Sequence, residues 1–390
     1  MKALIIKISL VAVILLAAVN VYALVDSRGT ENTFDIATWN LKEFPRLDDR
    51  TVDTLAILIQ DLQLDVIAVQ EIMDTVAFAD LLSQLDGWDG LYSTDGTSDY
   101  YQKTGLLYRT DQVSVLSWEP IFWTGYEWEF PRPPIRITLS VTLPSGTLDF
   151  YLIVLHLKAY DDDESRERRM AAMVLLKEYL DGIVPFLPNH NWMMVGDYND
   201  ELTDSEDENI FWDFLQDSTD YTFLTEELAG NVYWSSYPSY NSLIDHIMVT
   251  SSMMDIFGEN GVIETLRLDD QYSRYLTVIS DHRPVMAQFT DFSTGIEDDT
   301  PPLPDGFKIT SYPNPFNATT NISFSLTSAS QTKIDIYDCL GRRVTTLVDS
   351  YLNAGNYSIK FNASNLSSGV YFARLSTDDG VKVSKLNLIK

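Results

Sequence analysis

The sequence predicts an α/β protein followed by a small all-β sandwich, and three observations support this prediction. From Phe34 onward, apolar runs of strand length alternate with amphipathic stretches of helical period. Proline and acidic residues then dominate residues 293–306, a composition typical of an extended linker. After the linker, residues 307–390 contain short alternating strands punctuated by glycines, the pattern of a β-sandwich. We therefore expect a main domain at residues 32–292 and a separate β domain at residues 307–390.

The N-terminus has the features of an export signal. Lys2 and Lys7 precede an apolar run at residues 8–19, and Val21-Tyr22-Ala23 offers the small residues that a signal peptidase accepts. We predict a signal peptide at residues 1–23. The alternative is a retained membrane anchor, for which the apolar run is short against the ~20 residues of a membrane span.

The elements of the main domain follow from hydrophobic periodicity, and residues 87–101, rich in Gly, Asp, Ser and Tyr, are expected to form a surface loop. Helices are expected at residues 50–62, 75–85 and 164–180. Strands are expected at residues 34–39, 65–69, 104–108, 113–118, 135–143, 147–155, 192–195, 243–244 and 276–279, and in the β domain at residues 321–326, 333–337 and 357–361.

Charge and cysteine content limit the possible functions. The formal net charge is −30, and nine Lys/Arg and five Asp/Glu lie in residues 307–390, against 18 and 52 before them. A main domain this acidic repels polyanions, so a nucleic-acid substrate would need a local basic patch, a bound metal or screening salt. Cys339 is the single cysteine, which excludes an intrachain disulfide and a cysteine metal site.

Six strand-like runs each end in polar groups that can do chemistry. The clearest example is residues 191–200, where four apolar residues and Gly196 lead into Asp197, Asn199 and Asp200. At the end of a strand, side chains no longer face the core, so one rim of a sheet can collect catalytic groups. The other five runs end in Asn40, in Gln70-Glu71, in His156, in Asp245-His246 and in Ser280-Asp281-His282.

This set suits the hydrolysis of a phosphoester. Glu71 is placed to bind a hard cation through oxygen, and Mg²⁺, Mn²⁺ or Ca²⁺ prefer such ligands. A metal neutralises phosphate oxygens while polar groups hold an attacking water in line. His156 and His282 could contact phosphate or move protons near neutral pH, with Asp245 as the group that orients His282. His190, in a Pro-Asn-His-Asn loop, is expected to be an ordinary surface residue.

Six fragments occur in the order seen in the endonuclease/exonuclease/phosphatase superfamily, and together they span residues 34 to about 290. They are Trp39-Asn-Leu41, Gln70-Glu71, Leu155-His-Leu-Lys158, Gly196-Asp-Tyr-Asn199, Asp245-His246 and Ser280-Asp-His-Arg-Pro284. The resemblance implies a four-layer sandwich of two mixed β-sheets flanked by helices, and hydrolysis of phosphodiesters or phosphomonoesters with Mg²⁺ or a similar ion.

The resemblance also assigns roles to individual residues. Glu71 would hold the metal with help from Asn40 and Asp281. Asp197 and Asn199 would orient or deprotonate the water and contact phosphate. His156 and the Asp245–His282 pair would stabilise the phosphate or act as acid and base.

Within the superfamily, residues 104–116 look like the deoxyribonuclease I branch, in which a tyrosine in the place of Tyr108 contacts phosphate. Phe130-Pro-Arg-Pro-Pro134 resembles the arginine-bearing strand entry of that branch, which implies that Arg132 binds substrate phosphate. The chain departs from the branch at Gln102, which aligns with the carboxylate that orients the first catalytic histidine. His156 is therefore expected to be less basic here.

The β domain is similar to the C-terminal sorting domain of type IX secretion, found in Bacteroidetes and related Gram-negative bacteria. The likeness lies in Tyr312-Pro-Asn-Pro-Phe316, Tyr337-Asp-Cys-Leu-Gly-Arg342, Leu352-Asn-Ala-Gly355 and Ser368-Gly-Val-Tyr-Phe-Ala373. It implies contact with the type IX machinery, passage through the outer membrane, and then either release by cleavage of the tail or attachment to the cell surface. The alternative is a stable carbohydrate-binding or adhesive module.

Together these observations predict a secreted, metal-dependent phosphodiesterase, expected to be a monomeric nuclease that cuts extracellular DNA or RNA. A phospholipid phosphodiesterase of the sphingomyelinase kind, or another phosphatase, is the main alternative, because the surface is acidic and aromatic residues crowd the expected loops. These aromatic residues are Phe122, Trp123, Tyr126, Trp128, Tyr233, Trp234, Tyr237 and Tyr240. A non-catalytic surface binding protein is the third possibility, although every rim position is filled by a chemically competent residue.

Overall fold

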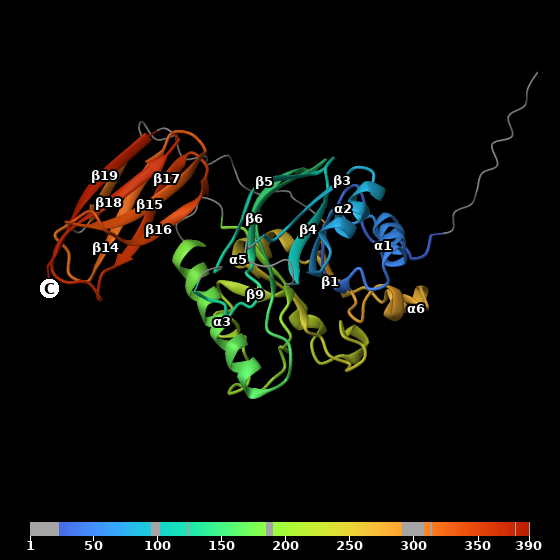
Figure 1. Cartoon of the computed structure of the whole chain (residues 1–390). Helices are drawn as coiled ribbons and strands as arrows, with labels where there is room; N and C mark the ends of the chain where they lie inside the picture. The colour runs from blue at the N-terminus through green and yellow to red at the C-terminus, as the bar shows by residue number, and fades with distance from the viewer. Residues whose placement is uncertain are drawn as a thin grey trace, which may run out of the picture.

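The computed structural model describes residues 23–94, 102–122, 125–184, 190–290, 308–312, 314–378 and 380–389. Two bodies of different architecture are visible in Figure 1, the main part (residues 23–290) and an all-β tail (residues 308–389). The predicted signal peptide, the membrane-anchor alternative at residues 8–19 and the predicted linker lie almost wholly outside the described residues. Among the residues that the structure describes, no helix is both long enough and apolar enough to cross a bilayer.

The main part contains two six-stranded mixed sheets. The first sheet runs, in spatial order, β11 (Val262–Thr265), β12 (Val285–Phe289), β1 (Phe34–Phe44), β2 (Val66–Ile72), β4 (Lys103–Arg109) and β3 (Trp88–Tyr92). The second runs β5 (Val113–Pro120), β6 (Ile135–Leu143), β7 (Gly146–His156), β8 (Trp192–Asp197), β10 (Asp245–Thr250) and β9 (Tyr221–Phe223). Each sheet has one parallel pair at its centre, β1 with β2 and β7 with β8.

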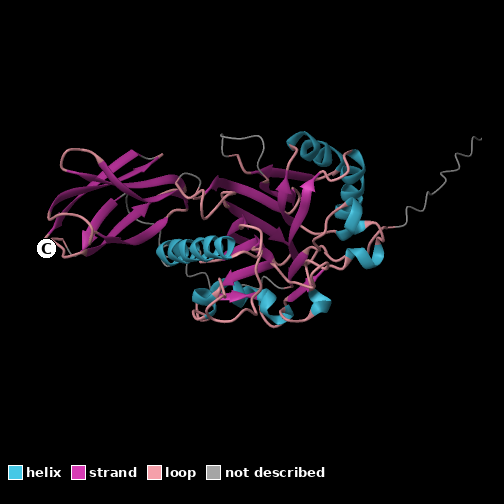
Figure 2. Ribbon diagram, turned by 60° about the horizontal axis from the view of Figure 1, so that its bottom comes forward, coloured by secondary structure: helices cyan, strands magenta, loops and turns pink. Residues whose placement is uncertain are grey.

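Helices cover the outer face of each sheet, which gives four layers (Figure 2). The sheets bury apolar residues such as Ile36 and Val154 between them. Outside the first sheet, Leu55 and Leu58 of helix α1 pack in one apolar cluster with Ile67. The helices are α1 (Asp49–Leu62), α2 (Thr75–Gln84), α3 (Asp163–Ile183), α4 (Trp212–Leu215), α5 (Ser251–Phe257), α6 (Leu268–Gln271), α7 (Tyr275–Val278) and the 3₁₀ turns η2 (Leu224–Leu228) and η3 (Val232–Trp234). The predicted four-layer sandwich is confirmed.

Three predicted elements were wrong in kind or position. Residues 276–279 lie in and just after helix α7 rather than in a strand, and β12 begins only at Val285. Residues 243–244 precede a strand instead of forming one, since β10 begins at Asp245. Residues 88–92, expected in a loop, form the edge strand β3, while residues 95–101 of that loop lie outside the described residues. Short apolar runs do not distinguish a strand from a buried helical turn, which explains the first error.

The tail consists of a three-stranded and a four-stranded antiparallel sheet, as predicted for a small β-sandwich. The first contains β13 (Lys308–Tyr312), β14 (Thr319–Leu326) and β17 (Gly355–Asn362), and the second β16 (Arg343–Leu352), β15 (Ser330–Asp338), β18 (Gly369–Thr377) and β19 (Gly380–Leu388).

The tail packs against the main part at helix α3 (Figure 1). The guanidinium of Arg136, on β6, donates to the hydroxyl of Tyr179 at 2.6 Å and to the backbone oxygen of Asp349 in the tail at 3.4 Å. Tyr151 in the middle of β7 and Trp192 at the start of β8, which pair with each other, belong to the apolar cluster that continues into the tail. On β8 the tail therefore lies at the end away from Asp197.

Candidate active site

The strand ends gather at one rim of the two sheets. In the first sheet, Asn40 on β1 pairs with Gln70, so that Asn40 and Glu71 are neighbours. In the second sheet, Asp197 at the end of β8 pairs both with His156 of β7 and with Asp245 of β10. The sheets pack face to face, so these two rows of side chains meet. Asn40 shows this directly, because its amide donates to Glu71 at 3.1 Å and to Asp197 at 2.8 Å.

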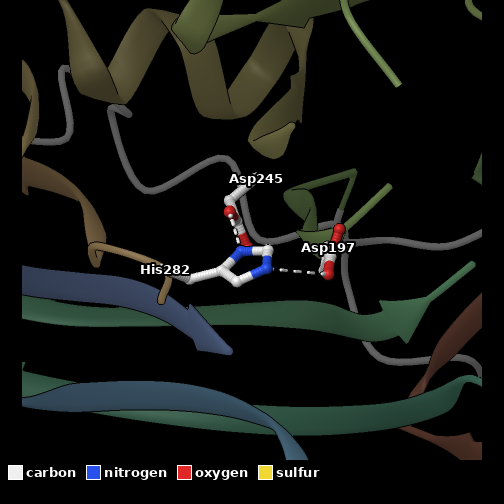
Figure 3. Close-up of side chains that lie close together, drawn as sticks. All are labelled: Asp197, Asp245 and His282. Atoms are coloured by element: carbon white, nitrogen blue, oxygen red, sulfur yellow. Dashed lines mark hydrogen bonds and ion pairs between the residues drawn. The ribbon is translucent and has the colours of Figure 1, made fainter. Parts of the chain in front are cut away.

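His282 lies between two carboxylates (Figure 3). Its Nδ1 donates to Oδ2 of Asp245 at 2.8 Å, and its Nε2 lies 3.9 Å from Oδ2 of Asp197. Burial alone would lower the pKa of His282, but the charges of Asp245 and Asp197 outweigh it and raise the pKa to about 9. Asp245, predicted to orient His282, is thus in direct contact with it.

Asp197 is the carboxylate at the centre of the rim. It is 1% exposed, and burial, together with the charge of Asp245, raises its pKa to about 7. Besides the amide of Asn40, Oδ1 of Asp197 accepts the backbone N–H of Asn199 at 2.9 Å. A buried carboxylate in contact with amide, imidazole and backbone donors is held in one orientation, which is what a group that positions water requires.

His156 is a neutral imidazole in this arrangement. Its Nε2 lies 3.5 Å from Oδ2 of Asp197, and within the described residues its Nδ1 has no hydrogen-bond partner. Burial lowers its pKa well below the usual value, and the positive charge of Arg132 adds to this. The side-chain oxygen of Gln102 accepts from Arg132. The expectation of a less basic His156 agrees with this pKa shift, although burial rather than the Gln102 substitution is the main cause.

Glu71 and Asp281 face the same cation, Lys42. The backbone N–H of Glu43 donates to Glu71 at 2.9 Å, and Nζ of Lys42 lies 3.6 Å from Oδ2 of Asp281. Burial would lower the pKa of Lys42, but Asp281 and Glu71 raise it above its usual value. The other carboxylate oxygen of Asp281, Oδ1, is buried and has no hydrogen-bond partner among the described residues. Lys42 was missed from the sequence; its place two residues after Asn40, in the same strand, was the available signal.

Several residues at and near the rim have a left-handed backbone conformation. Lys42, Glu43, Glu71 and Asn199 all have positive φ, at 47°, 49°, 64° and 55°. Such conformations cost of order 1–3 kcal/mol for residues other than glycine and are typical of functional sites. The strain at Glu71 has a visible result, since its side chain reaches the amide of Asn40 while β2 continues to Ile72.

Arg132 and Asn199 lie on the His156 side of the rim. Both donate to the backbone oxygen of Leu157, Arg132 at 3.0 Å and Asn199 at 3.3 Å. Arg132 also donates from Nε to Gln102 at 3.0 Å. The negative charges of Glu71 and Asp197 act on its guanidinium, so Arg132 lies within electrostatic range of the rim. A cation here is well placed for an anionic ligand.

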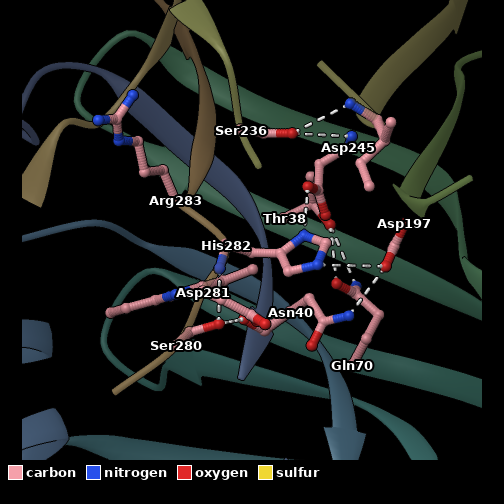
Figure 4. Close-up of polar contacts among 12 residues, drawn as sticks. Thr38, Asn40, Gln70, Asp197, Ser236, Asp245, Ser280, Asp281, His282 and Arg283 are labelled. Atoms are coloured by element: carbon pink, nitrogen blue, oxygen red, sulfur yellow. Dashed lines mark hydrogen bonds and ion pairs between the residues drawn. The ribbon is translucent and has the colours of Figure 1, made fainter. Parts of the chain in front are cut away.

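Hydrogen bonds from neighbouring residues hold this arrangement (Figure 4). The hydroxyl of Ser280 donates to the backbone oxygen of Asn40 at 2.6 Å and accepts the N–H of His282 at 3.0 Å. The hydroxyl of Ser236 accepts the N–H of Asp245 at 3.1 Å. Arg283 is fixed by Asp269 at 2.7 Å and by backbone and side-chain oxygens of Ser235.

Tyr108, predicted to contact phosphate, is at the wrong end of the sheet. It pairs with Val66 at the start of β2, whereas the rim follows the end of that strand near Ile72, which pairs with Lys103. Its hydroxyl donates to Asp89 at 3.2 Å. The prediction failed because the local sequence likeness did not determine how β4 is registered against β2.

The other two histidines lie outside the site. His190 is exposed, as expected. His246 is fully buried, with Nδ1 3.0 Å from the hydroxyl of Thr225 and Nε2 3.0 Å from the backbone oxygen of Asp200, and burial lowers its pKa to about 4. Its role is therefore structural.

The rim offers two groups of metal-ligand type. Ligand atoms of Asp197, Asp245 and His282 lie within 4.8 Å of one another. The Asp245–His282 hydrogen bond already occupies Nδ1 of His282, so Nε2 is the ring nitrogen left for a ligand. Glu71 and Asp281 instead present carboxylate oxygens to Lys42. Oxygen ligands of this kind suit a hard divalent cation.

Two mixed sheets that bring carboxylates, amides and two imidazoles to one rim define a phosphoester hydrolase of the deoxyribonuclease I fold. Comparison with known families agrees: residues 37–282 match the endonuclease/exonuclease/phosphatase family, and residues 310–390 match the secretion system C-terminal sorting domain. The chain belongs to the endonuclease/exonuclease/phosphatase family, whose members depend on divalent metals. Its tail implies secretion or location at the cell surface, as in Bacteroidetes.

Several solved structures are similar to this chain. A mannosyl-6-phosphatase of Bacteroides thetaiotaomicron is 17% identical, with a TM-score of 0.48 over 65% of this chain and 98% of the other. The human Nocturnin catalytic domain is 16% identical, with a TM-score of 0.47 over 68% and 96% of the two chains. TDP2 of D. rerio, solved with a single-strand DNA product, is 18% identical, with a TM-score of 0.46 over 66% and 98%. None of the curated protein sequences matches this chain.

Proposed function

We propose that this protein is an exported, divalent-metal-dependent phosphodiesterase that hydrolyses extracellular DNA or RNA by in-line attack of water. The observation that carries the proposal is the meeting, at one rim, of the Asp245–His282–Asp197 row with Asn40 and Glu71. Such an arrangement provides an oriented carboxylate, a cationic imidazole and an oxygen-ligand set around one small volume.

Glu71 would hold the metal, with Asn40 and Asp281 as further ligands. The donor set fits a hard cation, because the ligand atoms are oxygens and Oδ1 of Asp281 is buried with no hydrogen-bond partner among the described residues. We propose Mg²⁺ or Mn²⁺, with Ca²⁺ as a further candidate. Once bound, the ion would neutralise negative charge on the phosphate oxygens.

Residues of the protein would orient the attacking water and form hydrogen bonds to the phosphate. Asp197, held by Asn40 and by the backbone N–H of Asn199, would orient the attacking water and accept its proton. His282, charged and held by Asp245, would donate a hydrogen bond from Nε2 to the phosphate. Preorganised donors of this kind stabilise the charge that develops in the transition state.

His156, Asn199 and Arg132 would bind the phosphate from the other side. His156 is neutral, so it acts as a hydrogen-bond donor rather than as a cation. Arg132 supplies positive charge, because guanidinium groups bind phosphate through a fixed fork of donors.

A phospholipid phosphodiesterase is the second candidate. The acidic surface and the exposed aromatic rings of Trp128 and Tyr160 favour it, since aromatic side chains at a rim can enter a lipid interface. Side-by-side assays separate the candidates: plasmid DNA, RNA, sphingomyelin vesicles, inositol phosphates and a sugar phosphate, each with Mg²⁺, Mn²⁺ or chelator. We expect hydrolysis of a nucleic acid that requires the metal. Turnover of sphingomyelin alone would replace the nuclease proposal.

Variants test the site in the same assays. His282→Gln should abolish hydrolysis, and His190→Gln, which changes an exposed histidine outside the rim, should leave it unchanged. Full activity of the His282 variant would remove the assigned mechanism. For export, we propose removal of residues 1–23; the N-terminal sequence of the secreted protein tests this.

A further inference from the structure

Two tyrosine rings extend from the imidazole of His282 toward the solvent. The ring of Tyr237 lies over His282, with centroids 4.8 Å apart and planes at 30°. The ring of Tyr240 stacks on Tyr237, with centroids 5.2 Å apart and planes at 13°. Tyr240 is nevertheless 73% exposed. One face of its ring is therefore covered by Tyr237 and the other is open to solvent.

The turn that carries these rings is built in one conformation. Tyr237 donates its N–H to the backbone oxygen of Ser242 at 2.9 Å, and its own backbone oxygen accepts the N–H of Ser242 at 3.3 Å, which closes a tight hairpin. Inside the hairpin, the N–H of Tyr240 donates to the oxygen of Tyr237 at 3.2 Å, and Asn241 takes a left-handed φ of 59°. Asparagine tolerates this conformation better than most residues. The stack is thus set by the backbone and not by side-chain packing alone.

The same turn is tied to the Asp245–His282 pair. The hydroxyl of Ser236 accepts the N–H of Asp245 at 3.1 Å, and the backbone oxygen of Ser236 accepts the N–H of Arg283 at 2.7 Å. Ser236, the residue before Tyr237, is therefore hydrogen-bonded to the segments that position Asp245 and His282. Stacked rings keep a fixed place relative to any phosphate that His282 contacts.

Tyr233, an exposed tyrosine earlier in the same loop, is different. It is 54% exposed, but the guanidinium of Arg267 lies 4.4 Å from its ring centroid, and Trp234 packs edge-on against it at 4.7 Å. Its ring is engaged within the protein, whereas the outer face of Tyr240 is free for a ligand. The two residues form a matched pair for mutagenesis.

We propose that Tyr240 is a stacking platform for a nucleobase of single-stranded nucleic acid, next to the phosphate that is cut. This inference rests on the proposed nuclease function and adds a preference for single strands. Bases in a duplex already stack on each other, so only an unpaired base can lie on an exposed ring. Stacking also needs no positive charge, which matters for a chain of net charge −30 that repels polyanions.

The experiment compares three substrates of equal length: a single-stranded oligonucleotide, its duplex, and an oligomer with the same phosphodiester backbone but no bases. Full-length wild type, Tyr240→Ala, Tyr240→Phe and Tyr233→Ala are assayed for kcat/KM with Mn²⁺. Tyr240→Ala is expected to lower kcat/KM on the single strand about 5- to 100-fold, the range for loss of one base–aromatic stack. Its activity on the base-free oligomer should not change. Tyr240→Phe and Tyr233→Ala should behave as wild type.

The other possible results separate a failure of the stacking proposal from a failure of the nuclease proposal. An unchanged single-strand activity in Tyr240→Ala overturns the platform and leaves the nuclease proposal standing. An equal loss on the base-free oligomer shows damage to the hydrolytic rim, and it also overturns stacking. If wild type cuts neither oligomer, the proposed function fails together with this inference. If Tyr240→Ala instead loses hydrolysis of sphingomyelin vesicles that wild type performs, the ring is a lipid anchor and not a base platform.

Discussion

The hydrogen bond between Asp245 and His282 joins the two sheets of the main part. Asp245 is the first residue of β10 in the second sheet, and His282 lies three residues before β12 in the first, yet Oδ2 and Nδ1 are 2.8 Å apart. The pair therefore forms only when both sheets are packed face to face. A variant of Asp245 therefore tests whether this contact between the sheets contributes to activity.

Asp245→Asn should lower kcat about 10²- to 10⁴-fold, the usual contribution of a positioned acid–base group. The amide has no negative charge to stabilise a cationic imidazole, although it has nearly the shape of the carboxylate. Steady-state kinetics on whichever phosphoester the wild type hydrolyses measure the effect, with circular dichroism to confirm folding. Asp255→Asn, which changes an exposed aspartate of helix α5, is the matched control. A kcat within twofold of wild type would show that the pair is structural.

Glu71→Gln should weaken divalent-metal binding roughly tenfold or more, because the amide keeps the size of the side chain and removes its charge. Titration calorimetry with Mn²⁺ measures binding directly, independently of turnover. Chelator should abolish hydrolysis by wild type, and added Mg²⁺ or Mn²⁺ should restore it. Glu226→Gln, an exposed glutamate of η2, serves as the control. Unaltered Mn²⁺ affinity would move the metal to another part of the rim.

Tyr108→Phe should change kcat/KM by less than twofold. The hydroxyl donates to Asp89 and lies at the end of β2 opposite to Glu71. A loss of activity comparable to that of the Asp245 variant would contradict the strand register between β2 and β4 and would revive the sequence-based prediction.

The protein should become less stable as pH rises, because the buried carboxyl group of Asp65 then ionises. Burial, together with the charge of Asp35, raises its pKa to about 7, despite the backbone N–H of Asp35 and the nearby Arg109. The unfolded chain has the ordinary value of 3.8, so the folded state binds the extra proton between pH 4 and 7. The free energy of unfolding therefore falls as pH increases through this window.

Asp65→Asn should remove that dependence and should be more stable than wild type above pH 7, by ~2 to 4 kcal/mol. The amide oxygen can still accept the N–H of Asp35, which donates at 2.9 Å. Urea unfolding at pH 5 and pH 8 measures the difference. If the free energy of unfolding changed equally with pH in the variant and in wild type, the raised pKa of Asp65 would be contradicted.

Salt should affect this enzyme far less than a basic nuclease. Proteins that bind DNA through many cationic contacts lose about 10³- to 10⁵-fold in affinity between 50 and 200 mM salt. Here the chain carries a net charge of −30, so salt screens repulsion as well as attraction. We expect kcat/KM on an oligonucleotide to change only a few-fold, with a singly charged phosphodiester as reference substrate. A steep decrease would reveal a basic surface not evident from the charge.

The rim was largely predictable because polar residues follow buried strands directly in the sequence. Asn40, Glu71, His156 and Asp197 were placed in this way, and each lies where strand-end geometry requires. Asp245 and His282 also reached the rim, although the segments before them are not strands. The strands that follow them, β10 and β12, begin at the rim and run away from it. An alternating pattern does not show in which direction a strand runs, so the sequence did not distinguish this case from a strand that ends at the rim.

The remaining features depend on contacts between residues far apart in sequence. Lys42 follows Asn40 in β1, which brings it near the rim, but its contact with Asp281 forms only because β1 lies beside β12. The error at Tyr108 has the same origin, since strand register is set by the partner strand. Tyr237 and Tyr240 were noticed as part of an aromatic cluster, but their alignment with His282 required the hairpin geometry.

The position of the tail leaves the rim accessible while the tail is attached. The tail rests on α3 and near Trp192 at the start of β8, at the end of that strand away from Asp197. A substrate approaching the rim meets no part of this contact. We therefore expect the protein to be active while the tail is still attached. Removal of the tail would then change where the protein acts and not whether it is active.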